Sequence, residues 1–255
     1  MEHTRPSTPI AGRADRTDRS SWRPAEFGTR RARDIADPIV EPVWEGRRVL
    51  VHIEPGLLQV VDAEGVVLVS RPAEASTSVA VTEPEDELEA VVAAISAALR
   101  AGQAVLDGVL TVQASRSGEG ALPGEVAIPT AGELAAQLVF GQRRRREDAA
   151  AAPGASAEPI RRPGDLLTFV ALDLLALDGE PLLDVPLLER KRLLESVLAE
   201  GPLVRRTAYV RLPVEIWLGS WRALGFRSVA YKAANSRYEP GRPNDGWAVA
   251  PIPRR

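Results

Sequence analysis

The sequence predicts an α+β fold, in which short strands joined by hairpins are combined with amphipathic helices. The chain has 255 residues, of which 45% are hydrophobic and 26% charged, so it can bury a substantial core. Turn signals containing Gly separate short apolar runs, and capped segments with apolar residues at helical spacing lie between them. Because most of the connections are short, we expect largely antiparallel sheets rather than a parallel doubly wound sheet.

Four short strands are expected soon after residue 38. They are bounded by turn signals of the Glu-Gly and Pro-Gly type and carry many β-branched residues. The expected strands are residues 39–44, 47–54, 57–62 and 66–70. We interpret them as one antiparallel meander, with His52 packed inside it as an ordinary core residue.

Four helices are expected from capping signals and apolar periodicity. The first begins at a capping box made by Thr82 and Glu85 and ends before Gly102. The others are expected over residues 130–141, 186–200 and 213–224. In the last of them, the apolar positions expected to be buried are Val214, Trp217, Trp221 and Leu224.

The remaining strands are predicted from short apolar runs next to Gly-containing turns. Two of them flank Asp107-Gly108, which is an ordinary turn signal when taken alone. The full set comprises residues 104–106, 110–112, 166–176, 203–212, 229–232 and 247–250.

The chain divides into a tail and one domain. Residues 1–37 are rich in Arg, Ser, Thr and Pro and show almost no apolar periodicity, so we expect a disordered basic tail. Residues 38–255 are expected to form a single domain. Within it, the stretch at about 142–163 is rich in Ala, Pro, Gly and Ser and is interpreted as a flexible linker that follows four consecutive arginines.

Composition excludes several classes of function. The chain has no Cys and only two His, so disulfides, thiolate metal sites and a His-based triad are not expected, and no metal site is predicted. No apolar run approaches the roughly 20 residues of a membrane span, and the start of the chain does not resemble a signal peptide, so we expect a cytoplasmic protein that does not enter a membrane. Of the 32 basic residues, 30 are Arg and two are Lys. Lysine-based covalent chemistry is therefore restricted to two residues. Lys191 is expected on a solvated helix face, and Lys232 is expected to pair with a carboxylate such as Glu45 or Asp173 or to contact a nucleotide phosphate.

Four segments occur in an order that resembles a known family. They are EPVWEGRR at residues 41–48, LDGVL at 106–110, FVALDLLALDG at 169–179 and GFRSVAYK at 225–232. Together with the stretch SRYEPGR at 236–242 and Trp247, they resemble the adenylation domain of ATP-dependent DNA ligases. The resemblance covers roughly residues 38–250 and implies the nucleotidyltransferase fold that these ligases share with RNA ligases and capping enzymes.

The resemblance also implies where a nucleotide site would lie. In the family, a lysine in the first motif attacks ATP, and the matching position here is Val43, so no catalytic residue is assigned. The implied cofactor-binding positions are Glu41, Glu45, Arg48, Leu172 and Lys232. The family uses ATP and Mg²⁺, and we expect neither to be bound reliably by this chain.

Most family positions that contact ATP or metal are altered, whereas positions that shape the fold are retained. Val109 and Arg227 replace two carboxylates, Leu172 replaces an aromatic residue that stacks on adenine, and Ala248 and Ala250 replace two lysines. The resemblance ends near residue 250, so we also expect the C-terminal OB-fold of the family to be lacking. The pattern is typical of a pseudoenzyme, that is, an adenylation domain without its reaction.

Three hypotheses about function follow from the sequence. The first is a catalytically inactive ligase relative, linked to DNA repair or recombination, that binds nicked or broken DNA ends or a repair protein. The second is an active polynucleotide ligase or nucleotidyltransferase that uses Lys232 or a substitute nucleophile. The third is a nucleotide-sensing or oligomerising scaffold that binds no nucleic acid.

Overall fold

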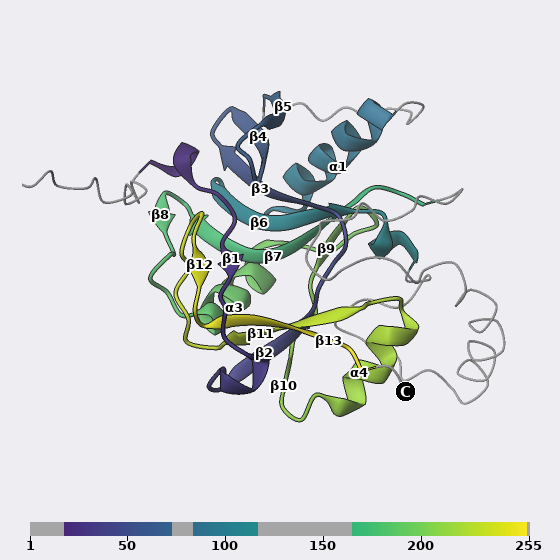
Figure 1. Cartoon of the computed structure of the whole chain (residues 1–255). Helices are drawn as coiled ribbons and strands as arrows, with labels where there is room; N and C mark the ends of the chain where they lie inside the picture. Colours follow the sequence, from purple (N-terminus) through teal and green to yellow (C-terminus); the bar gives the residue numbers. More distant parts are fainter. Residues whose placement is uncertain (1–17, 73–83, 117–164, 254–255) are drawn as a thin grey trace, which may run out of the picture.

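The computed structural model of the chain describes residues 18–72, 84–116 and 165–253. Within these ranges it contains a seven-stranded sheet, a four-stranded sheet and one short two-stranded pairing. Figure 1 shows the two larger sheets one above the other, with the N-terminal segment running down beside both. The expected α+β class with largely antiparallel strands is confirmed.

The larger sheet includes the expected meander. Strands β3 (Arg47–Glu54), β4 (Leu57–Asp62) and β5 (Val67–Arg71) pair antiparallel in that order. The remaining strands of this sheet are β6 (Ala104–Thr111), β7 (Thr168–Leu177), β8 (Glu180–Pro181) and β9 (Val204–Arg206). All of these neighbours are antiparallel except β9, which runs parallel to β7.

The prediction of two strands flanking a turn at Asp107-Gly108 is wrong, because β6 runs through both residues. Asp107 is fully buried, and Gly108 lies directly beneath a neighbouring ring. A Cβ atom added at Gly108 would lie 2.3 Å from a ring carbon of Phe169. The glycine is therefore present to admit Phe169 on the next strand rather than to turn the chain.

The smaller sheet has the order β10 (Val210–Arg211), β2 (Pro38–Pro42), β11 (Ser228–Ala233) and β13 (Trp247–Pro251). The assignment of β2 to the meander is therefore wrong, since the chain crosses to the larger sheet at Gly46. That glycine has φ 146°, and a Cβ there would lie 2.3 Å from the carbonyl oxygen of Leu110. The single strand expected over residues 203–212 is likewise split into β9 and β10, which belong to different sheets.

The helices pack against the sheets, and α3 contacts both of them. Helices α1 (Pro84–Ala98) and α3 (Leu187–Val197) bury Val92, Ile95 and Leu194 against the larger sheet. Helix α4 (Glu215–Ala223) packs Trp221 into a cluster that contains residues of the smaller sheet. None of the helices within the described ranges is both long and apolar enough to cross a lipid bilayer.

Two helix predictions need comment. The helix expected over residues 130–141 and the linker at 142–163 lie outside the described residues. Leu224 was expected to be buried, but it is 39% exposed because it caps the end of α4 just before Gly225, whose φ is 95°. Trp217 is only partly buried, on the rim of the cluster around Trp221.

The N-terminal segment from residue 18 onward is part of the domain, so the prediction of a disordered tail reaching residue 37 is wrong for residues 18–37. Trp22 is fully buried against Tyr238 and Trp247. The segment contains two short 3₁₀ turns, η1 (Arg19–Ser21) and η2 (Ala32–Asp34), and strand β1 (Glu26–Phe27), which pairs in parallel with β12 (Pro243–Asn244). The segment is held by a few contacts with residues that are distant in the sequence, and such contacts produce no periodic pattern in its own residues.

We expect replacement of Trp22 by Ala to destabilise the protein by about 3–5 kcal/mol, as for other buried large-to-small changes. The measurement is chemical denaturation followed by circular dichroism. Trp217→Ala is the matched control, because that indole is only partly buried and its loss leaves a smaller cavity. Equal losses for the two variants would contradict the placement of Trp22 in the core.

His52 gives the fold a pH dependence. Burial, assisted by the positive charges of Arg23 and Arg19, lowers the pKa of His52 from 6.5 to about 4. Between these pH values His52 is protonated in the unfolded chain but not in the folded chain. The free energy of unfolding therefore falls as the pH drops from 6.5 towards 4. Between pH 7 and pH 4.5, we expect the free energy of unfolding of wild type to fall by about 2–3 kcal/mol more than that of His52→Gln. The measurement is urea denaturation at both pH values. Parallel losses in the two proteins would show that His52 titrates normally.

Candidate functional site

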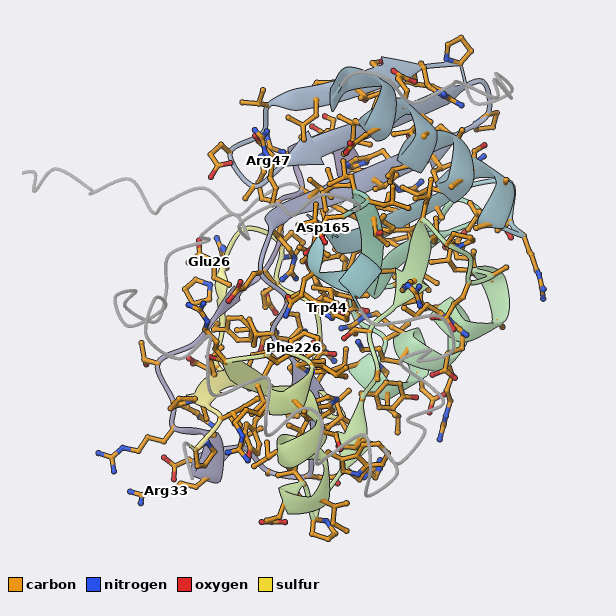
Figure 2. The ribbon with its side chains drawn as sticks, turned by 90° about the vertical axis from the view of Figure 1, so that its right-hand side faces the viewer. Glu26, Arg33, Trp44, Arg47, Asp165 and Phe226 are labelled. Carbon is orange, nitrogen blue, oxygen red and sulfur yellow. The ribbon has the colours of Figure 1, made fainter. Side chains whose placement is uncertain are left out.

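The first motif lies where the chain leaves the smaller sheet. Val43 follows β2, and its backbone N–H donates to the carbonyl of Ser228 at 3.0 Å, so Val43 itself extends the pairing with β11 by one bond. The next residue, Trp44, is 8% exposed and donates from its indole to the hydroxyl of Thr207 at 3.0 Å. Its ring meets that of Phe226 edge to face, with 4.7 Å between the centroids. Figure 2 shows this aromatic pair in the middle of the molecule.

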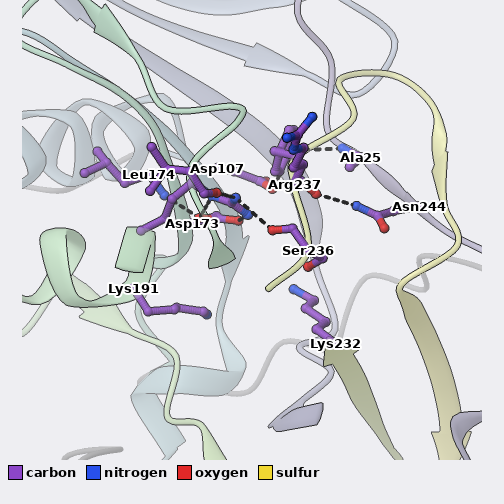
Figure 3. Close-up of polar contacts among 12 residues, drawn as sticks. Ala25, Asp107, Asp173, Leu174, Lys191, Lys232, Ser236, Arg237 and Asn244 are labelled. Atoms are coloured by element: carbon purple, nitrogen blue, oxygen red, sulfur yellow. Dashed lines mark hydrogen bonds and ion pairs between the residues drawn. The ribbon is translucent and has the colours of Figure 1, made fainter. Parts of the chain in front are cut away.

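Glu41 is the centre of a buried charge cluster. Its carboxylate accepts from the Nζ of Lys191 at 2.6 Å and also forms an ion pair with Lys232. All three side chains are at most 2% exposed. Figure 3 shows the two lysines extending towards one another from α3 and β11. The Lys232 ammonium also lies over the ring of Trp247, 4.3 Å from its centroid, which favours the charged form.

The electrostatics of the cluster follow from burial and from the number of charges in it. Burial opposes ionisation of Glu41, but Lys191 and Lys232 outweigh it and bring the pKa of Glu41 to about 2. Burial also lowers the pKa of Lys232, and the charges of Lys191 and Arg48 lower it further, against the attraction of Glu41. Glu41 is therefore fully ionised near neutral pH, and Lys232 is easier to deprotonate than an ordinary lysine.

A second pair of buried ions continues this cluster into the larger sheet. Arg48 donates from Nε and Nη2 to the two carboxylate oxygens of Asp107, both at 2.5 Å. Tyr238 donates to the same carboxylate at 2.7 Å and accepts from the backbone N–H of Ala25 at 2.8 Å. Burial opposes the charged form of Arg48, but Asp107 outweighs it and raises the pKa of the guanidinium. Burial and the Asp107 charge raise the pKa of the Tyr238 hydroxyl, so it stays a donor.

Helix α3 supplies a third ion pair. Arg190 donates two hydrogen bonds, of 2.9 and 2.7 Å, to the carboxylate of Asp173, and both side chains are almost completely buried. The three groups of ions share one region between the sheets. Their cations are Arg48, Arg190, Lys191 and Lys232, and their carboxylates are Glu41, Asp107 and Asp173. Positive charges thus outnumber negative charges by four to three, and the unmatched charge lies at the two lysines that share Glu41.

Glu45 and Arg227 form a separate, more exposed pair. Their side chains are 31% and 55% exposed, and Arg227 Nε lies 3.3 Å from the carboxylate. The backbone N–H of Glu45 donates to the side chain of Gln113 at 3.1 Å. In the described part of the chain, no group of three or more His, Cys, Asp or Glu side chains is arranged to hold a metal ion. With its carboxylate already matched by a guanidinium, Glu45 does not fit a Mg²⁺ site.

The positions matching the adenine and sugar contacts of the resembled family are apolar. Leu172 is 5% exposed and Val109 is 4% exposed. Both belong to one cluster with Trp44, Phe226 and Val170. Ala248 and Ala250 lie on β13, opposite Tyr231 and Val229 of β11. These side chains supply packing surface and carry no group able to bind phosphate or metal.

The structure brings three of the five predicted cofactor-binding residues together, namely Glu41, Arg48 and Lys232. Glu45 and Leu172 lie apart from them, in the exposed pair and the apolar cluster. That these five residues bind a nucleotide stays a prediction. Two expectations are wrong: Lys191 is buried rather than solvated, and Lys232 pairs with Glu41 rather than with Glu45 or Asp173. The partner of Lys191 is 150 residues away, so no local pattern could have revealed it.

Comparisons with known proteins agree with the fold. No protein-family model matches the chain. A DNA ligase of Thermococcus onnurineus (strain NA1) is 29% identical over 218 residues, which are 83% of this chain and 32% of that ligase. The ligase domain of LigD from M. tuberculosis superposes with a TM-score of 0.53 at 22% identity over 92% of this chain. A mycobacterial DNA ligase D complexed with ATP and MES superposes with a TM-score of 0.50 at 23% identity over 90% of this chain.

The expected resemblance to the ATP-dependent DNA ligases is therefore confirmed. The fold is that of their adenylation domain, and the sequence is similar to that of a DNA ligase. The chain spans 32% of the curated relative and 60% of each of the two solved ligase chains.

We expect Glu41→Gln to cost about 3–5 kcal/mol, because it leaves two buried lysines with no carboxylate. The readout is the free energy of unfolding at pH 7. Glu45→Gln is the matched control, since it removes the same charge from a partly exposed pair and should cost less than about 1 kcal/mol. A loss for Glu41→Gln as small as that of the control would contradict the buried cluster.

Proposed function

We propose that this chain, which has the fold of a DNA ligase adenylation domain, no longer forms the lysyl-adenylate and instead binds DNA ends or a DNA-repair protein. The observation that carries the proposal is that no lysine amine is free at the position of the family's nucleophile. Val43 stands at the nucleophile position, and both lysines of the chain are buried on the single carboxylate of Glu41. An amine held as an ammonium in an ion pair has no lone pair with which to attack phosphorus.

The surroundings of Val43 support the loss of chemistry. Glu45 is matched by Arg227, and Val109 and Leu172 add only apolar surface. Stabilisation of a reacting triphosphate requires cationic donors or a metal aimed at it. The cations Arg48 and Arg190 are instead held by Asp107 and Asp173.

Retention of the scaffold favours a binding role. The formal net charge is −3, so any attraction to DNA must come from local groups of arginines. Exposed arginines in the described part of the chain include Arg30, Arg31, Arg227, Arg237 and Arg242. The arginine pairs and runs at 143–146, 161–162 and 254–255 lie outside the described residues. Arginine contacts to phosphate position a protein on DNA without reading its sequence.

A second candidate function rests on Lys232 itself. The lowered pKa of its ammonium makes the neutral amine more accessible than in an ordinary lysine, and the contact with Glu41 fixes the position of Nζ. In this alternative, the Lys232 ammonium first loses a proton to solvent, the neutral Nζ bonds to the α-phosphorus of ATP as the bond to pyrophosphate breaks, and the second proton lost from nitrogen leaves with the pyrophosphate. This would make the chain an active nucleotidyltransferase with its nucleophile on β11 instead of at position 43.

Intact-mass spectrometry after incubation with ATP and Mg²⁺ separates the two candidates. We expect no adenylate adduct on wild type, since the lysines are engaged and Val43 has no amine. The control is Lys232→Ala, which leaves Glu41 paired with Lys191. An adduct of one AMP on wild type that is absent from Lys232→Ala would overturn the inactive reading and establish Lys232 as nucleophile.

Binding is tested separately by fluorescence anisotropy with a nicked duplex. We expect the affinity to fall linearly with the logarithm of the salt concentration, as phosphate contacts require. Absence of binding even at low salt would remove DNA from the proposal and leave a protein partner or a scaffold role.

A further inference from the structure

Arg205 lies on the face of the larger sheet that looks towards Trp44. It belongs to β9, where it pairs in register with Val170 of β7. Side chains that are directly opposite on neighbouring strands point to the same face, and Val170 is in the apolar cluster with Trp44. Thr207, two residues after Arg205 and on the same face, accepts the hydrogen bond from the Trp44 indole.

The neighbouring Arg206 shows that the two arginines point in opposite directions. Arg206 donates to the carboxylate of Glu200 and to the backbone carbonyl of Glu195 on α3. Leu194 of α3 packs in the cluster that contains Ala171 and Val204, which share the face of Arg206. Arg205 therefore points to the other face, towards the cluster that contains Val170 and Trp44.

Among the described residues, Arg205 has no carboxylate partner, unlike several other arginines. Its Nε is buried and has no hydrogen-bond partner within the described part of the chain. The guanidinium forms no ion pair there, whereas Arg48, Arg190, Arg206 and Arg227 each hold an acidic side chain. A buried donor without an acceptor costs free energy, and the cost is relieved if a ligand supplies the acceptor.

The surroundings indicate what kind of ligand would supply it. A guanidinium presents a planar fork of donors that matches the oxygens of a phosphate. The apolar neighbours Val170 and Val109 lower the local dielectric, which strengthens such a contact relative to one in water.

We propose that Arg205 is an anion-binding residue on the inner face of the larger sheet and takes a phosphate group. The inference rests on the proposed binding function and adds to it the residue and the ligand chemistry. The phosphate comes either from DNA or from a free nucleotide. The proposed site is distinct from the positions implied by the resemblance, because Arg205 lies in none of the motifs that carry it.

The test uses the full chain and three variants. Arg205→Gln removes the charge, and Arg205→Lys keeps the charge but loses the fork. The control is Arg192→Gln on α3, where the side chain is 59% exposed and the change in net charge is the same. One arm measures binding of nicked duplex with and without a 5′-phosphate, and the other measures binding of ATP and inorganic pyrophosphate.

In at least one arm we expect Arg205→Gln to weaken binding about tenfold, and Arg192→Gln to change it by less than about twofold. If DNA is the source, the salt slope should also fall by about one for Arg205→Gln. Arg205→Lys should fall between wild type and Arg205→Gln. As a direct readout, the Nε–H resonance of Arg205, assigned by its loss in Arg205→Gln, should shift when the ligand is added.

The outcomes separate the inference from the proposed function. If Arg205→Gln loses pyrophosphate binding and wild type does not bind DNA, the phosphate site stands and DNA is overturned as the source of the phosphate. DNA binding that Arg205→Gln leaves within about twofold of wild type keeps the proposed function and overturns the role of Arg205. If wild type binds none of these ligands, the phosphate site is overturned.

Discussion

The rest of the structure depends on the carboxylate of Glu41. It lies on β2 and holds one lysine from β11 beside it and another from α3, so a single buried group joins the smaller sheet to a helix that packs on the larger one. A buried carboxylate and ammonium are each costly to remove from water, and the cost is offset only when the geometry keeps them together. Misalignment of β2 or α3 would leave at least one of these charges unpaired. The cluster therefore restricts how the two sheets can sit against each other.

The same restriction shapes the neighbouring polar residues. Arg48 lies near enough to Glu41 and Lys232 to influence both, and it is held in turn by Asp107 and Tyr238. The Tyr238 hydroxyl then reaches the backbone of Ala25, which fixes the N-terminal segment over the network. Ion pairs and hydrogen bonds thus run without interruption from the outer segment to the interior. Because each member satisfies the next, the network favours one arrangement of the core over its alternatives.

Prediction from sequence succeeded where the signal is local. The apolar runs over residues 47–54 and 57–62, bounded by Gly-containing turns, predicted the bounds of β3 and β4 directly. It failed where the deciding contact is distant. Trp22 looked like part of a polar tail because its partners Tyr238 and Trp247 are more than 200 residues away, and Lys191 looked solvated because Glu-Arg-Lys-Arg is usually a helix surface. Of the candidate site, the motif order was predictable, whereas the pairing of both lysines with Glu41 was not.

The proposed loss of the reaction is compatible with the retained fold because most charges of the region are matched internally. Removing a nucleophile leaves the remaining charges of a site unbalanced unless others compensate. The pairing of Glu45 with Arg227 and of Asp107 with Arg48 provides that compensation without any ligand. Among the described residues, Lys191 and Lys232 nevertheless share the single carboxylate of Glu41, and Arg205 forms no ion pair. A core selected only for stability would tend to replace such groups by apolar ones of similar size. The proposed phosphate site at Arg205 would account for the retention of such groups between the sheets.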